Sequence, residues 1–221
     1  QRAAHFDALN ATIARLHRLD IETLGLGDYG RPGNFFARQI QRWSRQYQED
    51  DLAGRDPHMD RLVAWLPDNM PEDDGAACVA HGDFRADNVI FAPDSAEVRA
   101  VLDWELSTLG HPMSDFTYHL MMYRLPPAMI GGFSGADLPR LGVPSEADYL
   151  AAYCERVGRS LPTPSDLRFY MAFNMFRLAA IFHGIKGRIA RGTAASAHAQ
   201  TMADNLPALA ALAWAQTETT A

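Results

Sequence analysis

The chain has 221 residues, of which 48% are hydrophobic and 21% are charged, and its formal net charge is -7. These values are typical of a globular protein with its own core, and the acidic balance argues against nucleic acid as a partner. Its two cysteines, Cys78 and Cys154, form no CxxC motif, which predicts two buried thiols in a reducing cytoplasm. No apolar run approaches the roughly 18 residues of a membrane span, so we expect no membrane partner.

Helical periodicity dominates the first part of the chain. Apolar residues recur at steps of three and four over 2–19, which predicts one face of a helix. A turn-rich stretch follows, and Asn34 can then cap a second helix that continues to Tyr47. A third predicted helix covers 59–66 and ends before Pro67, because proline disfavours a helical residue in front of it.

The middle of the chain follows a different pattern. Short apolar runs occupy 77–80, 88–91 and 98–102, and proline, aspartate and serine residues divide them. Runs of four or five apolar residues between such turns are typical of strands. The sequence therefore predicts a small β element embedded in helices.

Helical patterns return after Asp115. We predict helices over 116–123, 146–157, 167–189 and 194–215, with Pro207 breaking or kinking the last of them and an irregular excursion over 128–144. The fold class is therefore mainly α with a small β insert, in a single domain.

The polar residues that suggest chemistry lie where the predicted strands end. His81, Asp83 and Asn88 follow the pattern His-x-Asp-x4-Asn between the first and second runs, and Asp103 follows the third. Asn88 and Asp103 offer hard oxygen ligands that suit Mg²⁺, which leaves Asp83 free to act as a base on a hydroxyl group.

This division of roles is what phosphoryl transfer requires, because its transition state depends on positioning and on charge neutralisation. The interval from Asp83 to Asn88 equals that in the catalytic loop of protein kinases. Arg85 has two interpretations that the sequence leaves open, a contact with the transferring phosphate or a structural ion pair. Glu105 is interpreted as a surface or neighbouring carboxylate outside the metal set, and His119 and His183 as core histidines with satisfied hydrogen bonds.

The chain resembles the aminoglycoside phosphotransferase (choline-kinase-like, APH) superfamily in three stretches, HGDFRADNVIF, AVLDWE and STLGHPMSDFTY. Two further stretches, GLGDYGRPGNFFARQIQRWSRQY and FYMAFNMFRLAAIFHGIKGR, are similar to kinase-like domains fused to, or encoded beside, acyl-CoA dehydrogenases. The resemblance covers nearly the whole chain. It implies a catalytic base at Asp83, and Mg²⁺ and nucleotide ligands at Asn88 and Asp103. His81 would organise the loop, and Asp115 would anchor it.

The resemblance also exposes two departures. His111 stands where many members of the superfamily carry aspartate, so we exclude it from the core site. The N-terminal β lobe of the superfamily, with its nucleotide-covering loop and strand lysine, has no counterpart, and the single lysine, Lys186, lies in a helical context. We therefore expect a protein-kinase-like C-terminal lobe alone, helical over 1–76, with the catalytic loop and metal-binding strands over 77–103 and a helical acceptor-binding part over 104–221. Without the missing N-terminal lobe as a partner, this chain should bind nucleotide weakly and turn over little.

The resemblance implies a phosphotransferase that uses Mg²⁺ and ATP or GTP to phosphorylate a hydroxyl of a small molecule. An acyl substrate such as a hydroxyacyl-CoA, and association with an acyl-CoA dehydrogenase, follow from the second resemblance and from the apolar helices after 115. Three alternatives stay open: a noncatalytic pseudokinase or interaction module, an antibiotic kinase of the aminoglycoside type, and a metal-dependent hydrolase.

Overall fold

The computed structural model describes residues 1–31, 33–194 and 197–218. Their contacts divide the chain into two compact units. The first unit consists of Gln1–Gly33 and Asp74–Pro162, and the second of Asn34–Asp73 and Thr163–Ala221. Every candidate site residue of the sequence analysis belongs to the first unit.

The first unit alternates helices with very short strands. Its elements are α1 (Arg2–His17), β1 (Cys78–Ala80), β2 (Val89–Phe91), β3 (Val98–Val101), β4 (Thr108–Gly110), α4 (Pro112–Leu120), α5 (Leu138–Leu141) and α6 (Glu146–Val157), with single 3₁₀ turns η2 (Ala86–Asn88), η3 (Trp104–Leu106) and η4 (Met121–Tyr123).

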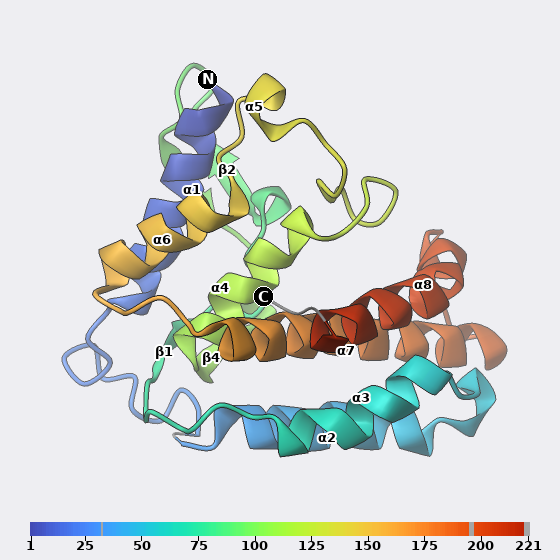
Figure 1. Cartoon of the computed structure of the whole chain (residues 1–221). Helices are drawn as coiled ribbons and strands as arrows, with labels where there is room; N and C mark the ends of the chain where they lie inside the picture. The colour runs from blue at the N-terminus through green and yellow to red at the C-terminus, as the bar shows by residue number, and fades with distance from the viewer. Residues whose placement is uncertain (32, 195–196, 219–221) are drawn as a thin grey trace. The chain divides into compact units, whose positions relative to one another are not determined.

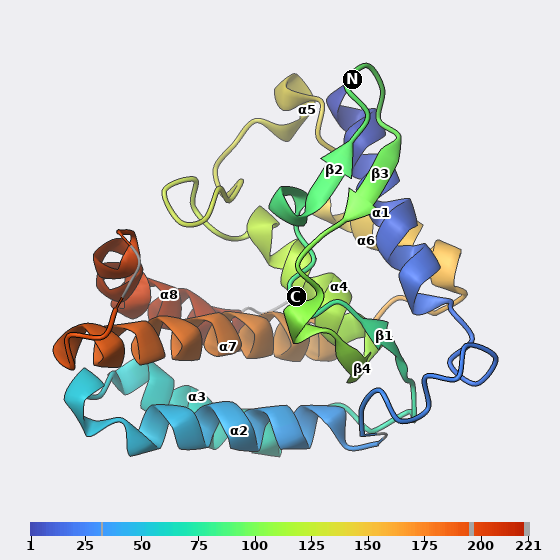
Figure 2. The same ribbon diagram turned by 180° about the vertical axis from the view of Figure 1, so that it is seen from behind.

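The four strands form two separate antiparallel pairs (Figure 2). In one pair β1 lies against β4, with Val79 opposite Leu109. In the other, β2 lies against β3, with Val89 opposite Val101 and an irregularity between Ile90 and Phe91. The second pair matters for function because its register places Asn88, just before β2, beside the end of β3.

Helices α1 and α6 lie side by side in both views of the first unit (Figures 1 and 2). Helix α1 also contacts β1 and β3, and α4 contacts β1. The Phe116 ring of α4 stacks on the Tyr153 ring of α6, with centroids 3.7 Å apart and planes inclined by 5°. Such burial of large apolar rings is the main stabilising contribution to a small core. The core thus fixes α4 and α1 around the segment that leaves β1.

The second unit is helical, with α2 (Phe35–Glu49), η1 (Asp51–Ala53), α3 (Pro57–Asp68), α7 (Pro164–Ala190) and α8 (Ala199–Glu218). Helix α7 packs against α2, α3 and α8, which explains why it is apolar on most of its faces. The Phe36 ring of α2 lies 5.1 Å from Phe173 and 5.2 Å from Phe169 of α7. Figure 1 shows α7 and α8, drawn in orange and red, running side by side.

The predicted helices are all present among the described residues, but proline limits them less than expected. Helix α3 passes through Pro67, because a proline in the last turn removes only one backbone hydrogen bond. Helix α8 is not broken at Pro207 either, and its buried Leu206 and Leu209 hold the helix on both sides of that residue. Residues 195–196 of the predicted helix over 194–215 lie outside the described residues.

Two other elements differ from the sequence prediction. Strand β4 was missed, because three residues carry no periodic signal and this strand exists only by pairing with β1. Helix α4 begins at Pro112 rather than at Phe116, since proline favours the first helical position. Among the described helices, none combines the length and the apolar character that crossing a bilayer requires.

Candidate functional site

The segment that follows β1 is held by one buried carboxylate, that of Asp115 in α4. Its Oδ2 accepts a hydrogen bond from the backbone N–H of His81 at 2.7 Å, and its Oδ1 accepts one from the N–H of Gly82 at 2.8 Å. The imidazole of His17 in α1 lies 3.0 Å from the same Oδ2. Both oxygens of one side chain therefore fix two consecutive peptide groups of the loop.

The ionised form of Asp115 is favoured despite its burial. Desolvation raises the pKa of this carboxyl, but the hydrogen bond and charge of His17 and the N–H groups of His81 and Gly82 outweigh it, so that the pKa lies below its ordinary value. His17 is itself oriented by the Tyr153 hydroxyl, 2.6 Å from its Nδ1. The anchor therefore joins α1, α4 and α6 to the loop.

Backbone geometry leaves little freedom at the start of this loop. The His81 side chain is fully buried, its Nε2 lies 2.8 Å from the carbonyl oxygen of Leu102, and its Nδ1 accepts from the N–H of Asp83 at 3.2 Å. Gly82 has φ of 84°, and a Cβ there would clash with the carbonyl oxygen of Leu106. Only glycine fits this position without a shift of the backbone.

Asp83 and Asn88 lie in direct contact. The Asn88 side-chain amide donates to the Asp83 backbone oxygen at 2.9 Å and to its carboxylate Oδ2 at 3.3 Å. The turn η2 between them brings the chain back on itself, and it leaves the Asp83 side chain 19% exposed. Among the described residues, the Asn88 carboxamide oxygen has no hydrogen-bond partner, so it remains available as a ligand.

Asp103 reaches the same end of the β2–β3 pair. The N–H of Leu102 donates to the Asn88 backbone oxygen at 2.8 Å, so that Asp103 lies one residue beyond this contact. Its backbone is left-handed, with φ of 64° and ψ of 58°, a conformation that aspartate adopts more readily than bulkier residues. The Asp103 side chain is exposed and makes no hydrogen bond or ion pair with any residue in the described part of the chain.

The side-chain oxygens of Asn88 and Asp103 fit a magnesium ion that would arrive with a nucleotide. One carboxamide oxygen and one carboxylate are hard ligands, and Mg²⁺ is usually held by one or two protein groups together with water and phosphate oxygens. Within the described residues there is no group of three or more His, Cys, Asp or Glu side chains that could hold a metal ion. Asn88 and Asp103 would therefore supply only part of the coordination of such an ion, and water or phosphate oxygens the rest.

Arg85 lies between the carboxylates of Asp83 and Asp87, on the loop that follows β1. Its Nη2 is 3.3 Å from Asp87 Oδ2, and its Nε is 3.8 Å from Asp83 Oδ2. The Arg85 side chain is 40% exposed although its Nε is buried, which leaves the side chain accessible to a further anion. Arg85 can therefore keep its ion pairs and still contact a phosphate, so the two interpretations from the sequence do not exclude each other.

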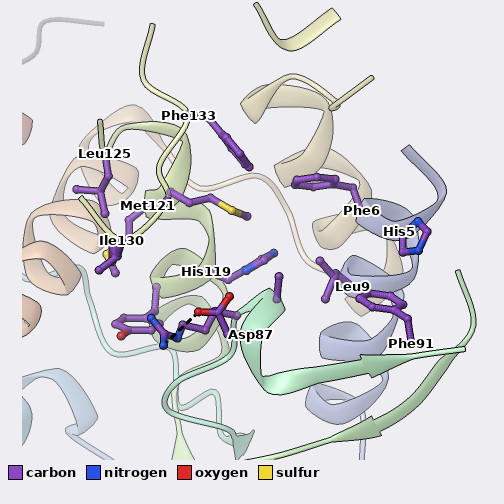
Figure 3. Close-up of a pocket in the computed structure, with 15 residues that line it drawn as sticks. His5, Phe6, Leu9, Asp87, Phe91, His119, Met121, Leu125, Ile130 and Phe133 are labelled. Carbon is purple, nitrogen blue, oxygen red and sulfur yellow. Dashed lines mark ion pairs between the residues drawn. The ribbon is translucent and has the colours of Figure 1, made fainter. Parts of the chain in front are cut away.

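A cavity of about 250 Å³ opens beside the loop (Figure 3). The loop residues 85–87 form part of its wall, and the remaining lining side chains are mostly apolar. The lining comprises His5, Phe6, Leu9, Arg85, Ala86, Asp87, Phe91, Tyr118, His119, Met121, Met122, Leu125, Ile130, Gly131 and Phe133. No pattern in the sequence indicates that Phe6 and Leu9 line a cavity, because the apolar face of a helix has the same periodicity whether it faces a core or a pocket.

His119 and His183 are both core histidines, but the prediction that their hydrogen bonds are satisfied is wrong for one nitrogen of each. His119 Nε2 lies 2.8 Å from the Tyr149 hydroxyl, and His183 Nε2 lies 2.8 Å from the Gly54 carbonyl oxygen. The Nδ1 atoms of both are buried without a hydrogen-bond partner among the described residues. Burial lowers the pKa of His119 to about 4, against the opposing charge of Asp115. His119 is therefore neutral at physiological pH.

His111 has a structural role that its position in the sequence did not disclose. It is the N-cap of α4, and its Nδ1 accepts from the N–H of Met113 at 3.2 Å. Its Nε2 lies 3.3 Å from Asp74 Oδ1. An imidazole nitrogen here fulfils the capping role that a carboxylate also fulfils at helix N-termini.

Replacing Asp115 with asparagine should destabilise the loop and the unit that contains it. A carboxamide can accept through only one atom, so one of the two backbone N–H groups would face an NH₂ group and remain unpaired. We expect the free energy of unfolding to fall by about 3 kcal/mol. Chemical denaturation measures this, with Asp94→Asn at an exposed turn as the matched control. Equal stability of the two variants would contradict the anchoring role.

His119 should make stability depend on pH in a defined window. The unfolded chain binds a proton on this residue below the ordinary value of 6.5, whereas the folded protein resists protonation down to about 4. The unfolded state thus binds more protons in this window, and the free energy of unfolding decreases as the pH falls, by at most about 3 kcal/mol.

Denaturation of wild type and His119→Gln near neutral pH and near the lower end of that window measures this contribution. The variant should lose less stability than wild type on acidification. An identical pH dependence in the two proteins would rule out His119 as its source.

Comparison with known proteins places this site in context. The chain is 41% identical over 216 residues to mouse (Mus musculus) acyl-CoA dehydrogenase family member 10, covering 97% of this chain and 20% of that protein. It is 37% identical over 211 residues to family member 11 of Rattus norvegicus, covering 95% of this chain and 27% of that protein. This chain therefore spans about a fifth to a quarter of the length of these relatives.

A solved structure is similar over nearly the entire chain. A Ralstonia eutropha JMP134 protein, solved as a candidate aminoglycoside phosphotransferase, matches with a TM-score of 0.93 and 44% identity, covering 98% of this chain and 65% of that one. The sequence model of the Phosphotransferase enzyme family (APH) matches residues 1–152, which include the loop after β1, the β2–β3 pair and the anchoring helix α4. On this evidence the chain belongs to the APH phosphotransferase family and has its kinase-like fold.

Proposed function

We propose that the protein containing this chain transfers the γ-phosphate of a Mg²⁺-bound nucleoside triphosphate, ATP or GTP, to a hydroxyl group of a small molecule. The observation that carries this proposal is the arrangement of three side chains. Asp83 contacts Asn88, and the β2–β3 pair brings Asn88 to the same end as Asp103. The Asp115 anchor holds the loop on which the first of them lies.

In the proposed reaction Asp83 accepts the proton of the acceptor hydroxyl. The acceptor oxygen then forms a bond to the γ-phosphorus, the bond from that phosphorus to the β,γ-bridging oxygen breaks, and its electron pair leaves with the nucleoside diphosphate. The proton passes from Asp83 to solvent, which can reach this partly exposed carboxylate. The Asn88 amide keeps the carboxylate in place through its hydrogen bond to Oδ2.

The charge of the phosphate groups requires compensation in the same place. Asn88 and Asp103 would hold Mg²⁺, which when bound neutralises charge on the phosphate oxygens. Arg85 adds a guanidinium beside Asp83, where it can stabilise negative charge on the transferring group.

The proposed acceptor is an acyl compound with a hydroxyl group, such as a hydroxyacyl-CoA. The cavity that adjoins the catalytic loop is lined mainly by aliphatic and aromatic side chains. Its one lining carboxylate, Asp87, pairs with Arg85, so the cavity offers a polycationic aminoglycoside little compensation of charge. The names of the relatives, which refer to acyl-CoA dehydrogenases, agree with this class and suggest association with such an enzyme.

Asp83→Asn in the full-length protein should reduce phosphate transfer to an alcohol acceptor by about 10²–10⁴-fold, because an amide cannot accept the hydroxyl proton. Nucleotide-dependent phosphorylation of a panel of hydroxylated acyl thioesters and aminoglycosides measures this. Asp94→Asn, at an exposed turn, is the control and should retain activity. Equal transfer by wild type and Asp83→Asn would instead support a noncatalytic binding module. Phosphate release without any acceptor would support a hydrolase.

We also propose that residues outside these 221 complete the nucleotide site, as an N-terminal lobe with a phosphate-binding lysine. This chain covers only part of the related solved structure. Titration calorimetry of this chain with Mg·ATP and Mg·GTP should give affinities weaker than micromolar, whereas the full-length protein should bind at least one of them more tightly. Micromolar affinity of the chain alone would contradict this proposal.

A further inference from the structure

The imidazole of His119 brings an unpaired nitrogen to the wall of the apolar cavity. His119 is 2% exposed, and its Nδ1 is buried without a hydrogen bond among the described residues. Buried polar atoms are almost always hydrogen-bonded, and an unpaired one costs free energy. Because His119 lines the cavity, a ligand there can supply the missing partner.

The hydrogen bond on the other side of the ring determines what His119 offers. Its Nε2 lies 2.8 Å from the Tyr149 hydroxyl, which has no second partner among the described residues. Each direction of this bond leaves one donor and one acceptor unpaired, so the relative strengths of the two groups decide between them. A phenol is a stronger donor than an imidazole N–H, and an imidazole nitrogen is a stronger acceptor than a phenol oxygen. Tyr149 therefore donates its hydroxyl proton to Nε2, and the ring carries its own proton on the unpaired Nδ1.

The position of this donor relates it to the proposed reaction. Figure 3 shows His119 among the side chains that line the cavity, between Asp87 and Phe6 in this view. The same cavity is lined by Arg85 and Ala86, which closely follow Asp83. A molecule that fills the cavity with an apolar chain therefore meets the uncharged imidazole of His119 near the loop that carries Asp83.

We propose that His119 is a specificity-determining residue whose Nδ1–H donates a hydrogen bond to a carbonyl oxygen of the phosphate acceptor. This inference rests on the proposed function and narrows its substrate class to apolar compounds that carry a carbonyl group as well as a hydroxyl. A neutral carbonyl matches this neutral donor, because a carboxylate that accepts from Nδ1–H would lose hydration without gaining an opposite charge from the imidazole.

The test compares two unreactive ligands that differ only in the carbonyl group. These are the S-ethyl thioester of octanoic acid and ethyl octyl sulfide, which carry no other carbonyl group and no hydroxyl. Calorimetric titration of the full-length protein gives their affinities in wild type, His119→Gln and His119→Asn. Glutamine places its amide near Nε2 and leaves no donor at Nδ1, whereas asparagine places an amide near Nδ1.

We expect His119→Gln to weaken thioester binding about tenfold and to leave thioether binding unchanged, the loss that one neutral hydrogen bond predicts. His119→Asn should stay within about threefold of wild type for both ligands. The proposal is overturned if His119→Gln weakens both ligands equally, if it weakens neither, or if wild type does not bind the thioester saturably.

A measurement on wild type alone covers the case in which a variant does not fold. Nitrogen NMR of the histidine-labelled protein should show the His119 proton on Nδ1, and a proton on Nε2 would overturn the proposal. Neither measurement requires turnover, because the two ligands carry no hydroxyl group that could be phosphorylated. A failure of phosphate transfer is therefore distinguishable from a failure of this inference.

Discussion

The carboxylate of Asp115 is the group on which the arrangement of the site depends. Its two oxygens accept from consecutive backbone N–H groups, those of His81 and Gly82, while His17 supports it from α1. A charge buried this deeply is tolerated only when it is paired and fully hydrogen-bonded. The loop and the anchor therefore stabilise each other, since each would leave the other with unsatisfied polar groups.

The positions of the other site residues follow from this attachment. Asp115 fixes the start of the loop, and Gly82 lets the backbone pass close to the carbonyl oxygen of Leu106. The turn η2 then reverses the chain, so that the Asn88 amide contacts the Asp83 carboxylate. The β2–β3 pair then brings Asp103 to the same end of the hairpin. The cavity adjoins this loop because α4, which carries the anchor, also carries His119 one turn further along. The anchor of the loop and a residue that lines the cavity are thus carried by one short helix.

The sequence predicted this site unevenly. The spacing of Asp83 and Asn88 was readable because both lie on one short loop, where local geometry decides their contact. The left-handed backbone conformation of Asp103 could not be predicted from the sequence, since aspartate adopts several conformations and only the hairpin imposes the left-handed one. His111 was noticed as a departure, but its role as a helix cap depended on where α4 begins.

The amino-acid sequence by itself determined the order of the helices, the three main strand segments and the motif with its proposed roles, because periodicity and spacing are local properties. Only the tertiary structure decided which side chains line the cavity beside the loop, which buried histidines of the described residues keep an unpaired nitrogen, and that β4 forms at all. Phe6 and Phe133 meet there from positions far apart in the chain, with ring centroids 5.8 Å apart. Such contacts depend on how α1, α4 and the following loop pack together, and no local pattern in the sequence encodes that packing.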